Sequence, residues 1–323
     1  KVAMAVLAVL LAVSQRLHSS PATGDVKVSA APVLDDRYPR RVVSFAGDVE
    51  SFPDLVYSTP PGYRPLHPDL YRQRTASQPR PLVIYIHGGG WQGGHTRHSG
   101  AFANWPEVLA SLAARGYVVA SLEYRLSGEA TFPAAIQDVK NAIRWLRLEA
   151  AQFGIDPSRV IVWGGSAGGH LAALAATTCK VASLDPPASP ASTQSDCVQG
   201  LVAWYGIFDL SSLNADSPVS RFLGCAPSQC ADVATRASPV TYIDAGDPPV
   251  LLIHGEKDKV VAVGQSQAFQ VALRAKNVRT ELLVIPGVDH SFIGSSPEAT
   301  QRASLEALSK TFAFIDSVTG RGR

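Results

Sequence analysis

The sequence predicts an α/β fold, in which a mostly parallel β-sheet is covered by helices on both faces. The chain has 323 residues, of which 46% are hydrophobic and 17% charged, so it can bury one large core in one domain. Short apolar runs alternate with helical patterns along it. Runs that are apolar on both faces are typical of strands buried on both sides, so the alternation indicates a doubly wound sheet.

The expected elements follow in order along the chain. Two shorter, edge-type strands are expected at 54–58 and 65–73, which leaves no helical cap at the N-terminus. Buried strands are expected at 82–86, 117–122, 160–163, 201–205, 250–253 and 282–285. Between the second and third of these, Pro133 to Phe153 places apolar side chains on one helical face. The stretch 207–247 has no clear strand and is expected to cover the site.

The ends of the chain differ from this pattern. Lys1, an apolar run and a polar stretch ending near Ala22 predict a signal peptide over 1–22. A retained N-terminal anchor is the alternative. A tether (23–43), one folded domain (44–318) and a basic tail (319–323) are expected to follow. We therefore expect a secreted or periplasmic protein without stable membrane association after signal removal.

Charge indicates no nucleic-acid partner. The net charge of +2 becomes 0 (2 − 2) once Lys1 and Arg16 leave with the signal, so no strong field favours nucleic acid or an anionic membrane.

Four cysteines fit an exported chain with two disulfides. Three pairings are open, and we favour the local pairs Cys179/Cys197 and Cys225/Cys230. Free buried thiols are the alternative. A metal site is disfavoured because no Cys-x-x-Cys pair or neighbouring histidine is present.

Residues 159–170, RVIVWGGSAGGH, combine an apolar strand with a Gly-x-Ser-x-Gly turn and an alanine-rich helix. This order is typical of a nucleophile elbow that holds Ser166 above the sheet. Gly164 and Gly168 would remove collisions beside it. A glycine-rich turn without chemistry is the alternative for the motif alone.

A serine hydroxyl needs a base, and the base needs an acid to orient it. The loops after the strands at 250–253 and 282–285 supply Asp258 and His290, in the chain order serine, acid, histidine. Both loops follow carboxyl ends of strands, where an open α/β sheet collects its functional residues. Glu256 is a weaker candidate for the acid, and Asp289 is too close to His290 in sequence. His170 is expected to be structural.

The strand at 82–86 ends in HGGGW, residues 87–91. Its glycine backbone can turn N–H groups toward a developing oxyanion, and Ala167 would supply another N–H. A phosphate cradle is the competing interpretation, but no Gly-Lys-Ser/Thr helix follows. Trp91 is expected to form one wall of the acyl pocket, or else to pack beneath the loop and shape it.

Several segments together resemble one esterase group: HGGGW, YRLSGEATFPAAIQD at 124–138, DPSRVIVWGGSAGGHLAAL at 156–174, DPPVLLIHGEKDKVV at 247–261 and GVDHSF. They resemble the bacterial feruloyl and acetyl xylan esterase branch of the α/β-hydrolases, which is similar to the hormone-sensitive-lipase-like carboxylesterases. The resemblance spans roughly 52–315. It implies an α/β-hydrolase fold with a mostly parallel eight-stranded sheet and no helical cap domain.

The resemblance also implies roles for particular residues. Ser166, Asp258 and His290 would be the triad, and Gly89, Gly90 and Ala167 the oxyanion donors. Tyr124 and Arg125 would support the oxyanion loop.

The expected function is a serine carboxylesterase that acts through an acyl-enzyme and needs no cofactor or metal. Short-chain or aromatic acyl esters are the expected substrates, including feruloyl or acetyl esters of plant polysaccharide, either as small molecules or polysaccharide-linked. A peptidase or formamidase on the same fold, or a catalytically inactive binding module, are the alternatives.

Overall fold

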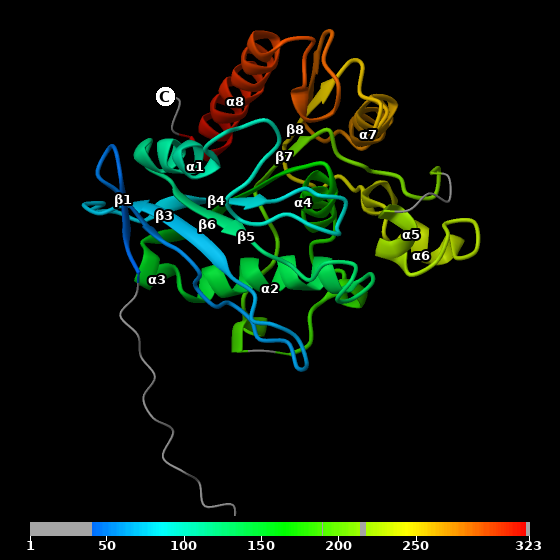
Figure 1. Ribbon diagram of the computed structural model, residues 1–323. Helices are drawn as coiled ribbons and strands as arrows, with labels where there is room; N and C mark the ends of the chain where they lie inside the picture. The colour runs from blue at the N-terminus through cyan, green and yellow to red at the C-terminus, as the bar shows by residue number, and fades with distance from the viewer. Residues whose placement is uncertain (1–40, 189, 214–217, 321–323) are drawn as a thin grey trace, which may run out of the picture. The chain divides into compact units, whose positions relative to one another are not determined.

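A nine-stranded sheet forms the centre of the described part of the chain in the computed structural model, which covers residues 41–320 except 189 and 214–217 (Figure 1). The strands are β1 Val43–Phe45, β2 Val49–Phe52, β3 Pro68–Gln73, β4 Arg80–Ile86, β5 Val118–Leu122, β6 Ile155–Gly165, β7 Gly200–Trp204, β8 Val250–Gly255 and β9 Thr280–Ile285. Their order is β1-β2-β3-β5-β4-β6-β7-β8-β9. Pairs from β5 to β9 are parallel, whereas β1, β2 and β3 pair antiparallel.

Helices cover both faces of this sheet, as expected. They are α1 Trp105–Ala114, α2 Ala134–Leu148, α3 Ala150–Phe153, α4 Ala167–Thr177, α5 Pro218–Leu223, α6 Ala231–Arg236, α7 Gly264–Ala275 and α8 Pro297–Thr319. Short 3-10 turns are η1 Ala182–Leu184, η2 Pro190–Thr193, η3 Pro239–Tyr242 and η4 His290–Phe292. One core joins α1 and α8 to the sheet, and a second core joins α2, α4 and α7 to it. Figure 1 shows α1 and α8 on one side of the sheet and α2 on the other.

The antiparallel edge of the sheet differs from the prediction of eight strands. The predicted strand at 54–58 is wrong, because only Ser58 makes a bridge there, to Leu66. Asp54 has a φ of 57° and donates its N–H to Asp69 Oδ1 at 2.9 Å, so the chain leaves the sheet at this point. The strands form earlier, as the β1/β2 hairpin, and β1 begins inside the predicted tether. The predicted strand at 65–73 is confirmed in its second part, as β3.

Most other predicted elements are confirmed. The predicted helix from Pro133 to Phe153 is present, but a break at Glu149 divides it into α2 and α3. β9 is an edge strand and only partly buried, not buried on both faces. The predicted signal peptide (1–22), most of the tether (23–43) and the last residues of the basic tail (319–323) lie outside the described residues. No described helix is long and apolar enough to cross a membrane.

No helix precedes β3 among the described residues, which begin at residue 41. The predicted covering segment 207–247 contains α5, α6 and η3, which the sequence pattern did not predict.

The structure forms the two local disulfides. Cys179–Cys197 closes the loop after α4, and Cys225–Cys230 joins the residues between α5 and α6. Such crosslinks typically contribute about 2–4 kcal/mol to stability.

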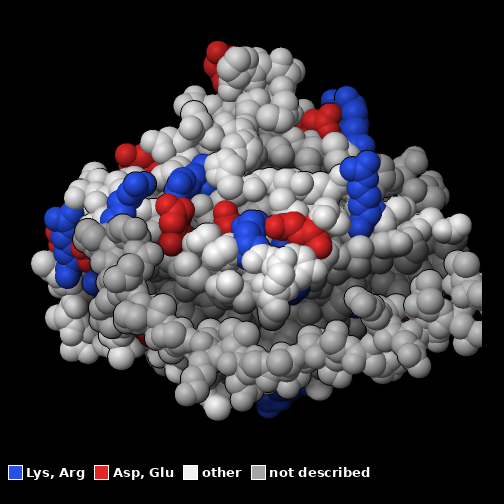
Figure 2. Space-filling model, turned by 60° about the horizontal axis from the view of Figure 1, so that its bottom comes forward, with Lys and Arg blue, Asp and Glu red and all other residues white. Residues whose placement is uncertain are grey.

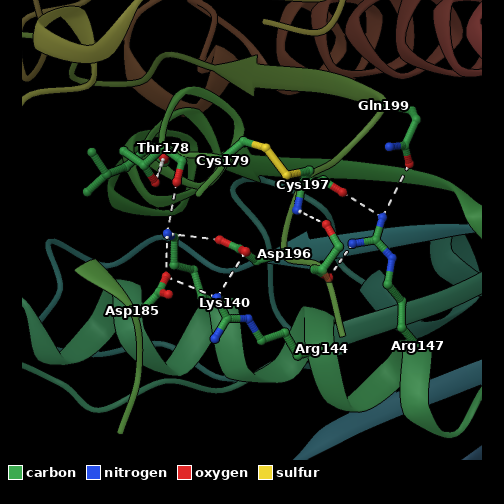
Figure 3. The surroundings of a disulfide bond; sticks show 11 residues. Lys140, Arg144, Arg147, Thr178, Cys179, Asp185, Asp196, Cys197 and Gln199 are labelled. Carbon is green, nitrogen blue, oxygen red and sulfur yellow. Dashed lines mark hydrogen bonds and ion pairs between the residues drawn. A yellow bond between two sulfur atoms is a disulfide. The ribbon is translucent and has the colours of Figure 1, made fainter. Parts of the chain in front are cut away.

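A buried ion-pair cluster lies beside the first disulfide (Figure 3). The Lys140 side chain is fully buried, and its Nζ lies 2.8 Å from Asp196 Oδ2 and 3.2 Å from Asp185 Oδ1. Arg144 contacts the same two carboxylates at 3.0 Å each. Lys140 also donates to the carbonyl of Thr178, at the end of α4, at 2.8 Å. The cluster therefore fixes the disulfide loop and the end of α4 to α2.

Many of the other charged side chains lie at the surface. Figure 2 shows acidic and basic side chains beside one another on the face that it draws. Surface ion pairs of this kind typically contribute only about 0–1 kcal/mol.

The buried cluster predicts a large cost for one substitution. In Lys140→Met, Asp196 loses one of its two cationic partners while it remains buried, so the free energy of unfolding should fall by about 3 kcal/mol. Lys310→Met is a matched control, because Lys310 pairs with Glu281 but its side chain is 42% exposed; its cost should stay below about 1 kcal/mol. Urea unfolding of the oxidised proteins measures both values. Equal costs would contradict this account of the cluster.

Candidate active site

The nucleophile elbow forms where β6 ends and α4 begins. Ser166 has φ 56° and ψ −122°, a conformation that a residue with a side chain adopts only under strain. A Cβ at Gly164 would lie 2.3 Å from the carbonyl oxygen of Gly168. One at Gly168 would lie 2.0 Å from the carbonyl oxygen of Ile86. Glycine at both positions therefore lets α4 pack close to β6 and β4, with Ser166 between them.

Ser166, His290 and Asp258 lie in one line of hydrogen bonds. His290 Nε2 is 3.0 Å from Ser166 Oγ, and His290 Nδ1 is 2.7 Å from Asp258 Oδ2. Because a carboxylate accepts, Nδ1 carries the hydrogen, and Nε2 is free to accept from the serine hydroxyl. The loops after β8 and β9 bring the acid and the histidine to the elbow, as the sequence indicated.

The carboxylate of Asp258 is surrounded by donors. Its Oδ1 accepts from the backbone N–H groups of Val260 at 2.9 Å and Val261 at 2.8 Å. Burial opposes ionisation of Asp258, but hydrogen bonds from His254, His290 and Val261 outweigh it and hold the pKa of Asp258 well below its usual range. Asp258 is thus kept as an anion facing His290.

The two rival carboxylates point elsewhere. Glu256 Oε2 accepts from the N–H of Gly287 at 2.9 Å. Asp289 Oδ1 accepts from the backbone N–H groups of Lys259 and His290, not from the imidazole. The geometry therefore favours Asp258 as the partner of His290.

The glycine-rich loop at 87–91 borders the same pocket as Ser166 and His290. Gly89 and Gly90 have φ values of 114° and 61°, which turn the backbone toward the pocket. Within the described part of the chain, no acceptor binds the backbone N–H groups of Gly89, Gly90 or Ala167. These groups are available to an oxyanion, and the N-terminal end of the α4 dipole adds to them.

Tyr124 contacts the start of this loop, as the resemblance implied, whereas Arg125 binds α2. The Tyr124 hydroxyl donates to the carbonyl of His87 at 3.0 Å, and its ring stacks on that imidazole at 4.4 Å. Arg125 binds Asp138 through Nε and Nη2, both at 2.8 Å. The Tyr124 contact fixes the strand end from which the loop starts, and the Arg125 pair joins the segment after β5 to α2.

Trp91 borders the pocket, but the residue is only 1% exposed. The indole stacks on Phe222 at 4.6 Å and donates its N–H to His170 Nδ1 at 3.2 Å. The Trp91 backbone is left-handed, with a φ of 57°. The alternative interpretation, that Trp91 shapes the loop, is the one that the packing favours.

His170 is structural, as predicted. It is fully buried, and its Nε2 donates to the carbonyl of Ala237 at 2.7 Å. Burial lowers its pKa to about 4, so it stays neutral.

A pocket of about 1160 Å³ opens at Ser166 and His290. Its lining is mainly apolar and includes Ile207, Phe208, Leu213, Val219, Val261 and Phe269. Asp209 is the one carboxylate among the described lining residues. Gln265 on α7 holds this wall, because its Oε1 accepts from the N–H groups of Phe208 and Asp209 at 2.8 and 2.9 Å. The covering segment 207–247 thus forms one side of the pocket.

Tyr205 is a site residue that the sequence analysis missed. It follows β7, and its ring packs edge-on against the imidazole of His290 at 4.7 Å. Burial raises the pKa of its hydroxyl, so it remains neutral. Its place at a strand's carboxyl end was the available signal.

Among the described residues, no group of three or more His, Cys, Asp or Glu is placed to hold a metal ion.

Comparison with known proteins shows which family and which proteins this chain resembles. The BD-FAE family profile matches residues 68–273. The esterase LipQ of Mycobacterium tuberculosis is 34% identical over 277 residues, which are 83% of this chain but only 62% of LipQ. The chain therefore spans less than two thirds of that relative.

Solved structures are similar as well. The bifunctional GH43-CE protein of Bacteroides eggerthii has a TM-score of 0.72 and 30% identity, over 85% of this chain and 36% of that one. An acetyl ester-xyloside bifunctional hydrolase from Caldicellulosiruptor lactoaceticus has a TM-score of 0.67 and 25% identity, over 81% and 91%. On the profile match and the shared architecture, this chain belongs to the BD-FAE family and has the α/β-hydrolase fold.

Proposed function

We propose that this chain is a serine carboxylesterase with Ser166, His290 and Asp258 as its catalytic triad. The observation that carries the proposal is the line of hydrogen bonds from Ser166 Oγ through His290 to the ionised Asp258, at the mouth of an apolar pocket. The likeness to the esterase LipQ supports it.

The proposed reaction has two halves. Ser166 Oγ attacks the ester carbonyl carbon while His290 Nε2 takes the hydroxyl proton, and the oxyanion accepts from the N–H groups of Gly89, Gly90 and Ala167. Each such donor is worth about 3 kcal/mol of barrier lowering. His290 then protonates the leaving alcohol, which departs and leaves an acyl-serine. A water that gives its proton to His290 attacks the acyl-serine, and Ser166 recovers the proton as the acid leaves.

The proposed substrates are short-chain or aromatic acyl esters, including acetyl or feruloyl esters of plant polysaccharide. The apolar lining and the volume of about 1160 Å³ support an aryl acid as well as acetate. The likeness to an acetyl ester-xyloside hydrolase supports a carbohydrate-linked ester. We also propose that the chain works in a secreted or periplasmic setting, which the two disulfides support.

Ser166→Ala tests the nucleophile. It removes the attacking oxygen, so kcat/KM for nitrophenyl acetate should fall at least about 10⁴-fold while the circular dichroism spectrum stays unchanged. Ser111→Ala, on the exposed face of α1, is the control and should keep wild-type turnover. Wild-type turnover in a folded Ser166→Ala protein would refute the proposal.

The same preparation should be compared on methyl ferulate and on an aminoacyl anilide. Ester hydrolysis should exceed anilide hydrolysis by a wide margin. A higher kcat/KM for the anilide would point to a peptidase instead.

Trp91→Ala tests the packing beneath the glycine loop. Because the indole is almost completely buried and packs against Phe222 and His170, kcat/KM should fall by a common factor for feruloyl and acetyl esters. Trp91→Phe, which keeps a ring but loses the N–H, should show the same uniformity with a smaller loss. Leu213→Ala, in the apolar wall, should instead change the feruloyl/acetyl ratio by about 10-fold. A changed ratio in the Trp91 variants would restore Trp91 as a pocket wall.

A further inference from the structure

A second histidine lies behind the acid of the triad. His254 is in β8 and is fully buried, and the triad mechanism does not use it. Its Nδ1 is 2.8 Å from the hydroxyl of Ser266, which is also fully buried on α7. Its Nε2 is 2.8 Å from the carbonyl of Val261 and 3.2 Å from Asp258 Oδ2.

These partners fix the ring's tautomer. A carbonyl oxygen only accepts, so Nε2 carries the hydrogen. Nδ1 then accepts from the hydroxyl of Ser266. One N–H is therefore directed at both the carbonyl of Val261 and the carboxylate of Asp258.

Four N–H groups lie around the carboxylate of Asp258. Oδ1 accepts from the backbone N–H groups of Val260 and Val261, and Oδ2 accepts from His290 Nδ1 at 2.7 Å. His254 Nε2 lies 3.2 Å from the same Oδ2. The imidazoles of His254 and His290 therefore both contact Oδ2, one from β8 and one from the loop after β9.

We propose that His254 is a positioning residue, which holds Oδ2 of Asp258 toward His290 and is itself oriented by Ser266. The inference rests on the proposed function, because it assigns His254 a role only through the triad. His254 also closes the 258–261 loop through the Val261 carbonyl, so the acid and its loop are held by one ring. Its effect on the reaction passes through Asp258.

His254→Asn and His254→Gln separate positioning from packing. The Asn amide reaches the place of Nδ1, whereas the Gln amide reaches the place of Nε2 and can still donate to Asp258. For nitrophenyl acetate, His254→Asn should lower kcat roughly 10- to 100-fold, while KM changes less than about threefold. His254→Gln should recover most of this loss.

A double-mutant cycle with Asp258→Asn tests whether His254 acts through Asp258. Asp258→Asn alone should lower kcat by about 10⁴-fold, still above the rate of Ser166→Ala. Because His254 acts through Asp258, adding His254→Asn to that background should change kcat less than about twofold. His170→Asn is the matched control, since His170 is as deeply buried but bonds Trp91 and Ala237. In the double variant, the loss of kcat caused by His170→Asn should multiply with the loss caused by Asp258→Asn.

The outcomes distinguish the two proposals. Near-wild-type kcat in Asp258→Asn would overturn the proposed triad. Suppose instead that Asp258→Asn lowers kcat as expected. The role of His254 alone would then be overturned if the kcat losses of His254→Asn and Asp258→Asn multiply, or if His254→Gln recovers none of the lost kcat. If His254→Asn does not fold, Ser266→Ala keeps the ring and removes its orienting hydroxyl. Ser266→Ala should lower kcat roughly 3- to 10-fold, and only when Asp258 is present. An unchanged kcat would overturn the inference. An equal loss of kcat in the Asp258→Asn background would overturn it as well.

Discussion

The close approach of α4 to β6 and β4 is the constraint on which the site depends. At Gly164 and Gly168, backbone atoms occupy the space where side chains would be, at 2.3 and 2.0 Å from an added Cβ. This approach holds Ser166 in a strained conformation, and its N–H donates to the carbonyl of Trp204 at 2.9 Å on the next strand. Packing against the rest of the sheet maintains this strained backbone conformation.

The parallel register of the sheet then brings the other groups to the same edge. β4, β6, β7, β8 and β9 all end there, so the glycine loop, the elbow, Tyr205, Asp258 and His290 follow carboxyl ends of neighbouring strands. At this edge the donors around Asp258 keep its carboxylate ionised in spite of burial. An imidazole between that anion and a hydroxyl is the arrangement that proton transfer needs.

Sequence patterns predicted the parts that depend on local rules. The six apolar runs placed six strands, although β9 is only partly buried, and the glycine spacing between a strand and a helix placed the elbow. Strand ends placed Asp258 and His290 correctly. The β1/β2 hairpin was missed because its strands have three and four residues and β1 is largely exposed, so no strong periodicity marks them.

Other features depend on contacts between distant segments. The direction of the Trp91 ring follows from a left-handed backbone and from Phe222 and His170, neither of which is near it in sequence. His254 stands in the run HGEKD, yet only the fold shows that its ring meets Asp258 and Ser266. The short helices α5 and α6 occupy a segment rich in Pro and Ser, where propensity gives little signal.

The central claim is that the elbow serine alone acts as the nucleophile, and a covalent label tests it most directly. The protein would be treated with a fluorophosphonate, which transfers its phosphonyl group to an activated serine and releases fluoride. The intact mass and the mapped peptides would then be measured against residual activity. We predict one phosphonyl group per chain, on Ser166, formed in step with the loss of esterase activity. Complete inactivation with the label on another residue, and Ser166 unmodified, would contradict the account.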